Sequence, residues 1–109
     1  MPTVIPFEDL RVSPTATLFQ GRDTTPVSIF VTGYERGQGP RLHQHPYPEV
    51  FVVLAGTARF TVGEEELTVE AGHIVVGPAN TPHRFKGAGD GTLRVVSVHS
   101  SPEVLQTDL

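Results

Sequence analysis

The sequence predicts an all-β domain, either a sandwich or a barrel of short strands. Glycine and proline are frequent, with 11 Gly and 10 Pro among 109 residues, and this composition disfavours helices. Apolar and polar residues alternate along several short segments, which is the period of a strand. Turn-forming residues interrupt these segments at intervals of roughly eight to twelve residues, as in β-sandwiches and barrels.

The clearest predicted strand runs from Pro26 to Tyr34. Val27, Ile29 and Val31 alternate there with the residues of the opposite face, so the segment has the period-two pattern of a strand. Further short strands are expected at residues 15–20, 57–63, 67–69, 74–76, 81–86 and 92–100.

Both ends of the chain are expected to leave the barrel, which occupies residues 15–101. Three prolines within residues 1–14 predict an irregular N-terminal arm that lies across the barrel mouth or is exchanged with a partner in a dimer. The run from Ser101 to Glu103 has a capping serine, a proline and an acid, which is the pattern of a helix start. We therefore expect a short C-terminal helix or tail over residues 102–109.

Composition and charge exclude several classes of function. The chain has no cysteine, so disulfides, thiolate metal sites and a catalytic thiol are not expected. The net charge is −4 and Lys86 is the single lysine, so nucleic acid is not an expected partner. The N-terminus lacks the pattern of a signal peptide, and no apolar run approaches the roughly 18 residues of a membrane span. We expect a cytoplasmic protein with no membrane partner.

Residues 37–56 contain three potential metal ligands, His43, His45 and Glu49. Side chains two residues apart on an extended chain leave the same face, roughly 6–7 Å apart, so both imidazoles can reach one ion. Glu49 has the same parity, and two prolines before it favour a bend that would turn its carboxylate back toward the histidines. A fourth ligand is expected from a strand that is distant in sequence, and His83 is the candidate.

Residues 37–56 and 72–87 together resemble the two sequence motifs of the cupin superfamily. The first segment matches at every defining position, with a glycine at each end and the three ligands at the family's spacing. The second retains a glycine, a proline and His83, and departs from the pattern at Asn80, where Gly is usual, and at Gly87, where Asn is usual. Asn adopts left-handed turns more readily than other non-glycine residues, so the first departure is mild. Fifteen residues separate the motifs, which resembles the small single-domain bacterial cupins.

The resemblance implies a jelly-roll barrel, also called a double-stranded β-helix. It also implies one divalent transition metal ion held by His43, His45, Glu49 and His83. Three imidazoles and one carboxylate suit Mn, Fe, Co, Ni, Cu or Zn, and the ligand set alone does not select among these ions. Such a set leaves open positions on the metal, which is typical of catalytic rather than structural sites.

The residues that share parity with the ligands are expected to form a dry, apolar pocket beside the metal. The expected pocket residues are Phe51, Val53, Phe60, Val62, Phe85 and His99. His99 is expected either to line this pocket or to hydrogen-bond the backbone, whereas His73 follows a turn glycine and is expected to face solvent. Tyr47 lies between the ligands and is the nearest candidate for a catalytic acid or base.

Three functions are compatible with the sequence. The first is a metal-dependent enzyme that acts on a small chelating organic substrate, with an oxygenase favoured over an isomerase or a lyase. The second is a non-catalytic module that uses the metal to bind a small molecule, and the third is a metal that only stabilises the barrel. We also expect a homodimer, because the edge strands of a small barrel are commonly covered or paired.

Overall fold

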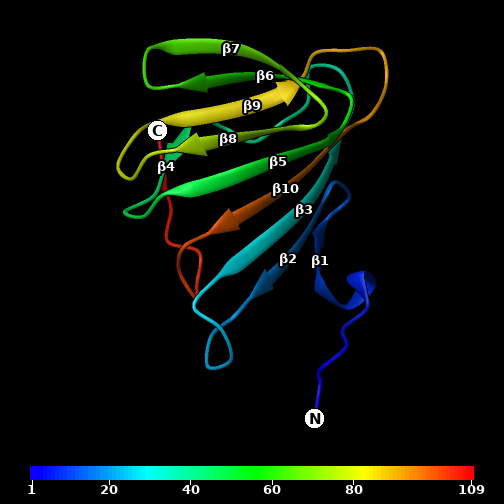
Figure 1. Cartoon of the computed structure of the whole chain (residues 1–109), viewed down its shortest axis with the longest axis vertical. Helices are drawn as coiled ribbons and strands as arrows, with labels where there is room; N and C mark the ends of the chain where they lie inside the picture. The colour runs from blue at the N-terminus through cyan, green and yellow to red at the C-terminus, as the bar shows by residue number, and fades with distance from the viewer.

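Eleven short strands form two antiparallel sheets that face each other as a jelly-roll barrel in this computed structural model, which describes residues 1–109 (Figure 1). The six-stranded sheet has the order β1-β2-β3-β10-β5-β8, and the five-stranded sheet has the order β11-β4-β9-β6-β7. The strands of the first sheet are β1 (Arg11–Ser13), β2 (Ala16–Gln20), β3 (Ser28–Tyr34), β10 (Leu93–His99), β5 (Glu49–Ala55) and β8 (His73–Gly77). The strands of the second are β11 (Thr107–Asp108), β4 (His43–Gln44), β9 (His83–Gly87), β6 (Thr57–Val62) and β7 (Glu65–Glu70).

The all-β class predicted from the alternating pattern is confirmed. Each of the six further segments that the sequence predicts as a strand overlaps an observed strand, and the segment at 26–34 forms β3. The structure contains a single helical turn, the 3-10 helix η1 (Phe7–Leu10). No helix has the length and apolar character that crossing a membrane requires.

An aromatic core fills the barrel beside the strands that carry Glu49 and His83. Phe51 on β5, Phe60 on β6 and Phe85 on β9 are all buried, and their ring centroids lie 5.1 to 5.5 Å apart. Aromatic pairs at such separations add to the free energy that burial of their surface already supplies. Glu49 lies two residues before Phe51 on the same face of β5, so this core forms a rigid floor beside the ligand residues.

The N-terminal arm is shorter than the sequence predicts. Residues 1–6 have no regular structure, but η1 follows them and β1 then pairs with β2, with Arg11 opposite Thr17. Ser13 accepts a hydrogen bond from the main-chain N–H of Thr15 at 3.2 Å, which closes the turn between the two strands. The prolines predicted an irregular arm over residues 1–14, and this interpretation missed the short strand β1.

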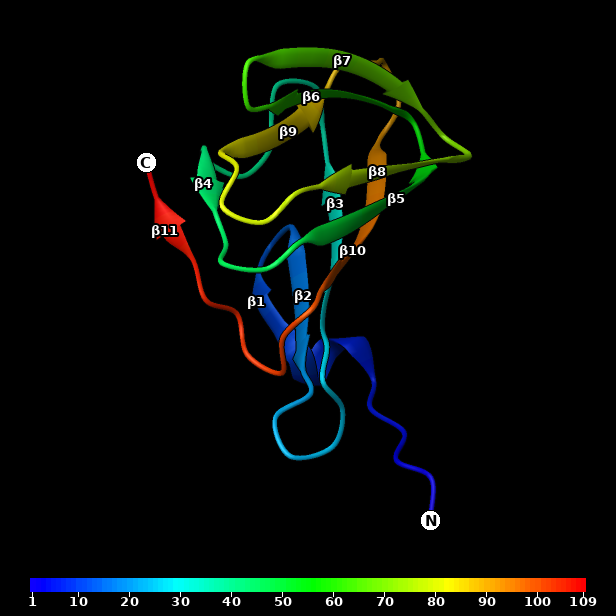
Figure 2. The ribbon, with the colours of Figure 1, turned by 60° about the vertical axis from the view of Figure 1, so that its left-hand side comes forward.

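Of the two alternatives for residues 102–109, the structure shows a tail and no helix. The capping contact exists, because the N–H of Glu103 donates to Ser101 Oγ at 3.3 Å, but no helix follows it. The N–H of Val104 instead donates to the side chain of Gln20 at 3.0 Å, and the chain continues to β11, which pairs with β4. A helix of one or two turns is costly to nucleate, whereas these long-range partners satisfy the same backbone groups. Figure 2 shows this tail passing from the end of β10 to the side of β4.

Candidate metal centre

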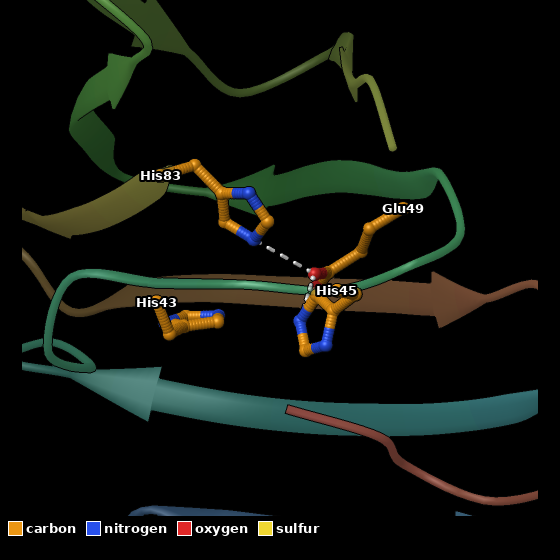
Figure 3. Close-up of side chains that lie close together, drawn as sticks. All are labelled: His43, His45, Glu49 and His83. Carbon is orange, nitrogen blue, oxygen red and sulfur yellow. Dashed lines mark hydrogen bonds and ion pairs between the residues drawn. The ribbon is translucent and has the colours of Figure 1, made fainter. Parts of the chain in front are cut away.

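Four buried residues from both sheets converge at one end of the barrel. They are His43 on β4, His45 just after it, Glu49 at the start of β5 and His83 at the start of β9 (Figure 3). Their potential ligand atoms all lie within 4.8 Å of one another. The structure therefore brings together the four residues that the sequence selects as ligands.

Local structure explains how residues so close in sequence reach one point from different sheets. His43 is the register partner of His83 in the five-stranded sheet. The chain bends at Pro46 and Tyr47, and then enters the six-stranded sheet with Glu49 as the first residue of β5. This bend returns the carboxylate toward the imidazoles, as the two prolines predicted.

The turn before His83 also fits its sequence. Asn80 has a φ of 57°, which is the left-handed conformation that Asn tolerates better than most residues. Its main-chain N–H donates to the carbonyl of His45 at 2.7 Å, which ties this turn to the first ligand segment. At Gly87 an added Cβ would lie 2.5 Å from the carbonyl oxygen of Glu35, so the asparagine usual at this position would not fit here.

The carboxylate of Glu49 lies at the middle of the group. Its Oε1 atom lies 3.1 Å from Nε2 of His45 and 3.0 Å from Nε2 of His83. Burial alone would raise the pKa of Glu49, but the adjacent imidazoles of His45, His83 and His99 outweigh it, so this pKa lies far below its usual range. Glu49 is therefore ionised and available as a ligand at neutral pH.

Main-chain carbonyls set the tautomer of each ligand histidine. Nδ1–H of His43 donates to Arg41, Nδ1–H of His45 donates to Leu105 at 2.7 Å, and Nδ1–H of His83 donates to Thr81 at 3.0 Å. In the neutral rings, the lone pair is then on Nε2, the atom that faces Glu49 in His45 and His83. Partners of this kind fix the orientation of metal-binding imidazoles in proteins.

The donor set fits a cation. Neutral Nε2 lone pairs and a carboxylate oxygen repel one another at about 3 Å unless a positive charge lies between them. Nε2 of His45 is buried and makes no hydrogen bond of good geometry, although Glu49 lies beside it. The carboxylate and the Leu105 carbonyl raise the pKa of His45 despite its burial, while burial lowers the pKa of His43. The group thus favours either an added proton or a metal ion at its centre.

A second hydrogen-bond chain supports Glu49 from the other side. The N–H of Leu105 donates to the hydroxyl of Tyr47 at 3.2 Å, and that hydroxyl contacts Nδ1 of His99 at 2.7 Å. Nε2 of His99 in turn lies 3.1 Å from Oε2 of Glu49, within ion-pair distance, although, like Nε2 of His45, it makes no hydrogen bond of good geometry. The Tyr47 hydroxyl accepts a hydrogen bond from the Leu105 N–H, and in the tautomer in which it donates to Nδ1 of His99 the proton of His99 is on Nε2, facing the carboxylate. Burial raises the pKa of Tyr47, so the phenol stays protonated.

A small cavity of about 80 Å³ opens beside Glu49. Of the expected pocket residues, Phe85 and His99 line it. Phe51, Val53 and Phe60 lie instead in the packed core, and Val62 packs against that core. The other cavity residues are Ala16, Phe30, Thr32, Tyr34, Pro40, His43, Ser97 and Gln106.

Sequence reasoning missed most of these cavity residues. Phe30, Thr32 and Tyr34 share one face of β3, so their alternation contained a signal, but the pattern alone does not indicate which face of the strand is inside. Gln106 and the main chain of Leu105 come from the tail, where no local pattern points to the site. His73 faces solvent as expected, with its Nδ1 donating to the carbonyl of Glu70 at 2.9 Å.

Comparison with known proteins agrees with this architecture. The sequence model of the cupin domain matches residues 30–99. The uncharacterized protein SCO3923 of Streptomyces coelicolor is 34% identical over 77 residues, which cover 71% of this chain and 72% of that protein. This relative shares the sequence pattern over most of both chains.

Solved structures share the fold at lower identity. The oxalate decarboxylase of Lactobacillus farciminis, in complex with formate, superposes with a TM-score of 0.80 at 20% identity over 94% of this chain. The Bacillus subtilis oxalate decarboxylase, a protein with Mn(II) centres, gives a TM-score of 0.77 at 20% identity over 89% of this chain. The chain spans 34% and 29% of the lengths of these two enzymes, so the likeness concerns one barrel. On its sequence pattern and its jelly-roll fold together, the chain belongs to the cupin domain family.

Proposed function

We propose that the protein binds one divalent transition metal ion through His43, His45, Glu49 and His83, and acts as an oxygenase-type enzyme on a small chelating molecule. The observation that carries this proposal is the convergence of three imidazoles and a carboxylate, with each Nδ1–H already engaged by a main-chain carbonyl. The Mn(II) centres of the Bacillus subtilis relative in fold support the same class of ion.

The charge of the site favours a monoanionic substrate. A divalent ion with one carboxylate ligand carries a net charge of about +1, and the cavity wall contains no arginine or lysine. A hydroxy acid or an enolised diketone offers two oxygens and one negative charge, which matches this balance. The cavity volume of about 80 Å³ restricts such a molecule to a few heavy atoms.

The chain's own residues would bind and orient this substrate. Phe30 and Phe85 supply apolar surface to the cavity wall, whereas Ser97 supplies a hydroxyl that can hydrogen-bond a substrate oxygen. His99 is the cavity imidazole outside the ligand group, and its chain to Tyr47 makes it the candidate for proton transfer. A bound redox-active ion such as Fe(II) or Mn(II) would supply the site for oxygen chemistry.

Metal content is the first test. Protein purified without a histidine tag should contain about one transition metal ion per chain by elemental analysis. His45→Ala and His83→Ala should each lose most of it, while His73→Ala, which removes an exposed histidine, should retain it. Full metal content in the His45→Ala variant would contradict the ligand assignment.

Ligand and oxygen measurements then separate the candidate functions. Small hydroxy acids and diketones should raise the melting temperature of the metal-loaded protein only, since a ligand stabilises the form that binds it. An oxygenase should also consume oxygen with one of these compounds in the Fe(II) or Mn(II) form, and Glu49→Ala should abolish this. Binding with conversion but no oxygen uptake would indicate an isomerase or lyase, and binding without conversion a non-catalytic module. Identical responses of the apo and metal-loaded protein would argue against an open metal site.

A further inference from the structure

The two aliphatic hydroxyls in the cavity wall differ in whether they have a partner within the chain. They belong to Thr32 on β3 and Ser97 on β10. Thr32 Oγ1 donates a hydrogen bond to the carbonyl of Val95 at 3.2 Å. Ser97 is only 4% exposed, yet its hydroxyl makes no hydrogen bond to another group of the chain. Ser97 therefore presents both a donor and an acceptor to the cavity.

Packing alone does not account for this serine. Ser97 is the register partner of Phe30 on β3 and of Phe51 on β5, so a small side chain is needed between two aromatic ones. Alanine would meet this need without burying a hydroxyl. Because a buried hydroxyl without a partner destabilises a protein, the hydroxyl of Ser97 is better explained by a ligand than by the fold.

Gln106 reaches the same cavity from the C-terminal tail, just before β11 pairs with β4 (Figure 2). Its Nε2 donates to Oδ1 of Asp108 at 2.6 Å. A carboxylate only accepts hydrogen bonds, so this contact fixes which end of the amide is the donor and leaves Oε1 free to accept. The preceding residue, Leu105, is bound through its main chain to His45 and Tyr47, so the segment that carries Gln106 is tied to the metal centre.

The position of Ser97 suits the far end of a metal-bound molecule. Ser97 and His99 lie two residues apart on the inward face of β10, which is roughly 6–7 Å along the strand. Nε2 of His99 lies 3.1 Å from Oε2 of Glu49. A bent path of a metal–oxygen bond of about 2.1 Å, three single bonds of about 1.5 Å each and a hydrogen bond of about 2.8 Å bridges a separation of this size. Ser97 can thus contact a substituent next to a chelating pair of oxygens.

We propose that Ser97 and Gln106 bind a second hydroxyl of the substrate, so that the protein selects small 2,3-dihydroxy acids. A hydroxyl both donates and accepts, so it can accept from Ser97 while it donates to Oε1 of Gln106. The carboxylate and the 2-hydroxyl of such an acid supply the chelating pair, so this inference rests on the proposed metal-dependent function. Glycerate is the smallest molecule of this class.

The wall of the cavity disfavours the two closest alternatives to this hydroxyl. A second carboxylate would meet no arginine or lysine there, and it would be repelled by Glu49 and by the Asp108 carboxylate that holds Gln106. A methyl group would leave the hydroxyl of Ser97 unpaired. Sites built to hydrogen-bond a substrate hydroxyl discriminate strongly against an analogue without it, since their own polar groups then lack a partner.

Titration calorimetry on the Mn(II)-loaded protein, without oxygen, compares three acids that differ in one substituent. Lactate has a methyl group and tartronate a carboxylate where glycerate has a hydroxymethyl group. The wild type should bind glycerate at least about tenfold more tightly than either of the others. Ser97→Ala should reduce the preference for glycerate over lactate to about twofold or less, with the affinity for lactate unchanged. Gln106→Met, which keeps the side-chain length, should reduce the preference by about threefold or more. Thr32→Val removes a hydroxyl that already has a partner and should keep the preference.

The stability of the ligand-free protein tests the unpaired hydroxyl without any metal. Ser97→Ala should unfold at or above the melting temperature of the wild type, because it removes a hydroxyl that has no partner in the chain. A clear decrease would mean that the hydroxyl supports the fold, and it would overturn the inference.

The calorimetric outcomes separate this inference from the proposed function. Equal affinity of the wild type for glycerate and lactate, or a preference that survives Ser97→Ala, would overturn the inference but leave the chelation of hydroxy acids intact. If none of the acids bound the metal-loaded protein, or if they bound the apo protein equally well, the proposed function itself would fail, and this inference with it.

Discussion

Nε2 of His99 lies 3.1 Å from Oε2 of Glu49, whereas Nε2 of His45 and Nε2 of His83 pair with the other carboxylate oxygen, Oε1. The two oxygens of one carboxylate therefore have separate partners. Oε1 faces His45 and His83, and Oε2 lies beside the imidazole of His99 at the cavity wall. This division keeps the carboxylate from rotating and presents a single oxygen to an ion.

Replacing His99 should therefore weaken metal binding without removing a ligand. His99→Phe leaves Oε2 without its partner, and loss of such an outer partner typically reduces metal affinity by about 10- to 100-fold. Competition with a chromophoric chelator measures the change. Ser97→Ala is the control, because Ser97 lies on the same strand and cavity wall but has no contact with Glu49. Equal affinity of His99→Phe and wild type would show that Glu49 is held by other contacts.

Tyr47 should contribute mainly to stability. Tyr47→Phe removes the hydroxyl that joins the Leu105 N–H to His99, so two buried groups lose a partner. We expect a loss of about 1–3 kcal/mol in the free energy of unfolding, with the metal content unchanged. Denaturant unfolding of the apo protein measures this loss of free energy. Tyr34→Phe, at a tyrosine that lines the cavity, keeps the Leu105–Tyr47–His99 chain intact and should cost less. A larger loss for Tyr34→Phe would refute this assignment.

The metal-induced increase in melting temperature should grow with pH. The pKa of His45 is raised, so its contribution to the stability of the apo protein is complete below the unfolded value of about 6.5 and is lost as pH rises through the folded value. Metal binding must displace that proton and becomes easier over the same range. The pKa of Glu49 is lowered, so its contribution persists above the unfolded value of about 4.3 and disappears only in acid. Differential scanning calorimetry of the apo and metal-loaded protein between pH 5 and 9 should show that the difference between their melting temperatures grows with pH. If the difference between the two melting temperatures stayed constant over this range, metal binding would not displace a proton from His45.

The turn at Asn80 should tolerate glycine and reject branched residues. Its φ of 57° is accessible to Gly without strain, so Asn80→Gly should change the free energy of unfolding by less than about 0.5 kcal/mol. Asn80→Val forces a β-branched residue into the left-handed region and should cost about 1–2 kcal/mol or more. Thermal unfolding distinguishes the two variants, and equal stability would mean that the turn has rearranged.

Sequence reasoning succeeded where spacing alone determines geometry. His43 and His45 share a face because they are two residues apart, and the prolines before Glu49 indicate the bend that brings it back. His83 required the family motif, because its distance from the other ligands depends on the pairing of β4 with β9. The strand pattern also fixed which side chains share a face of β3, but it did not show which face is inside. The face that is inside carries Phe30, Thr32 and Tyr34, which line the cavity.

Other features depended on contacts that no local pattern contains. Ser101 does cap the N–H of Glu103, yet the partners of the following residues lie on β2 and β4, so the local signal for a helix was overridden. The alternation along 92–100 placed His99 on the correct face, but its contact with Glu49 follows from the register of β10 against β5.

Leu105 supports the centre entirely through its main chain. Its carbonyl accepts from His45 and its N–H donates to Tyr47, while its side chain is half exposed. No side-chain identity at this position is required, so many residue types should be tolerated there. A single inserted or deleted residue between Ser101 and Leu105 would instead displace both contacts at once. In related sequences this part of the chain would therefore vary freely in composition and be constant in length.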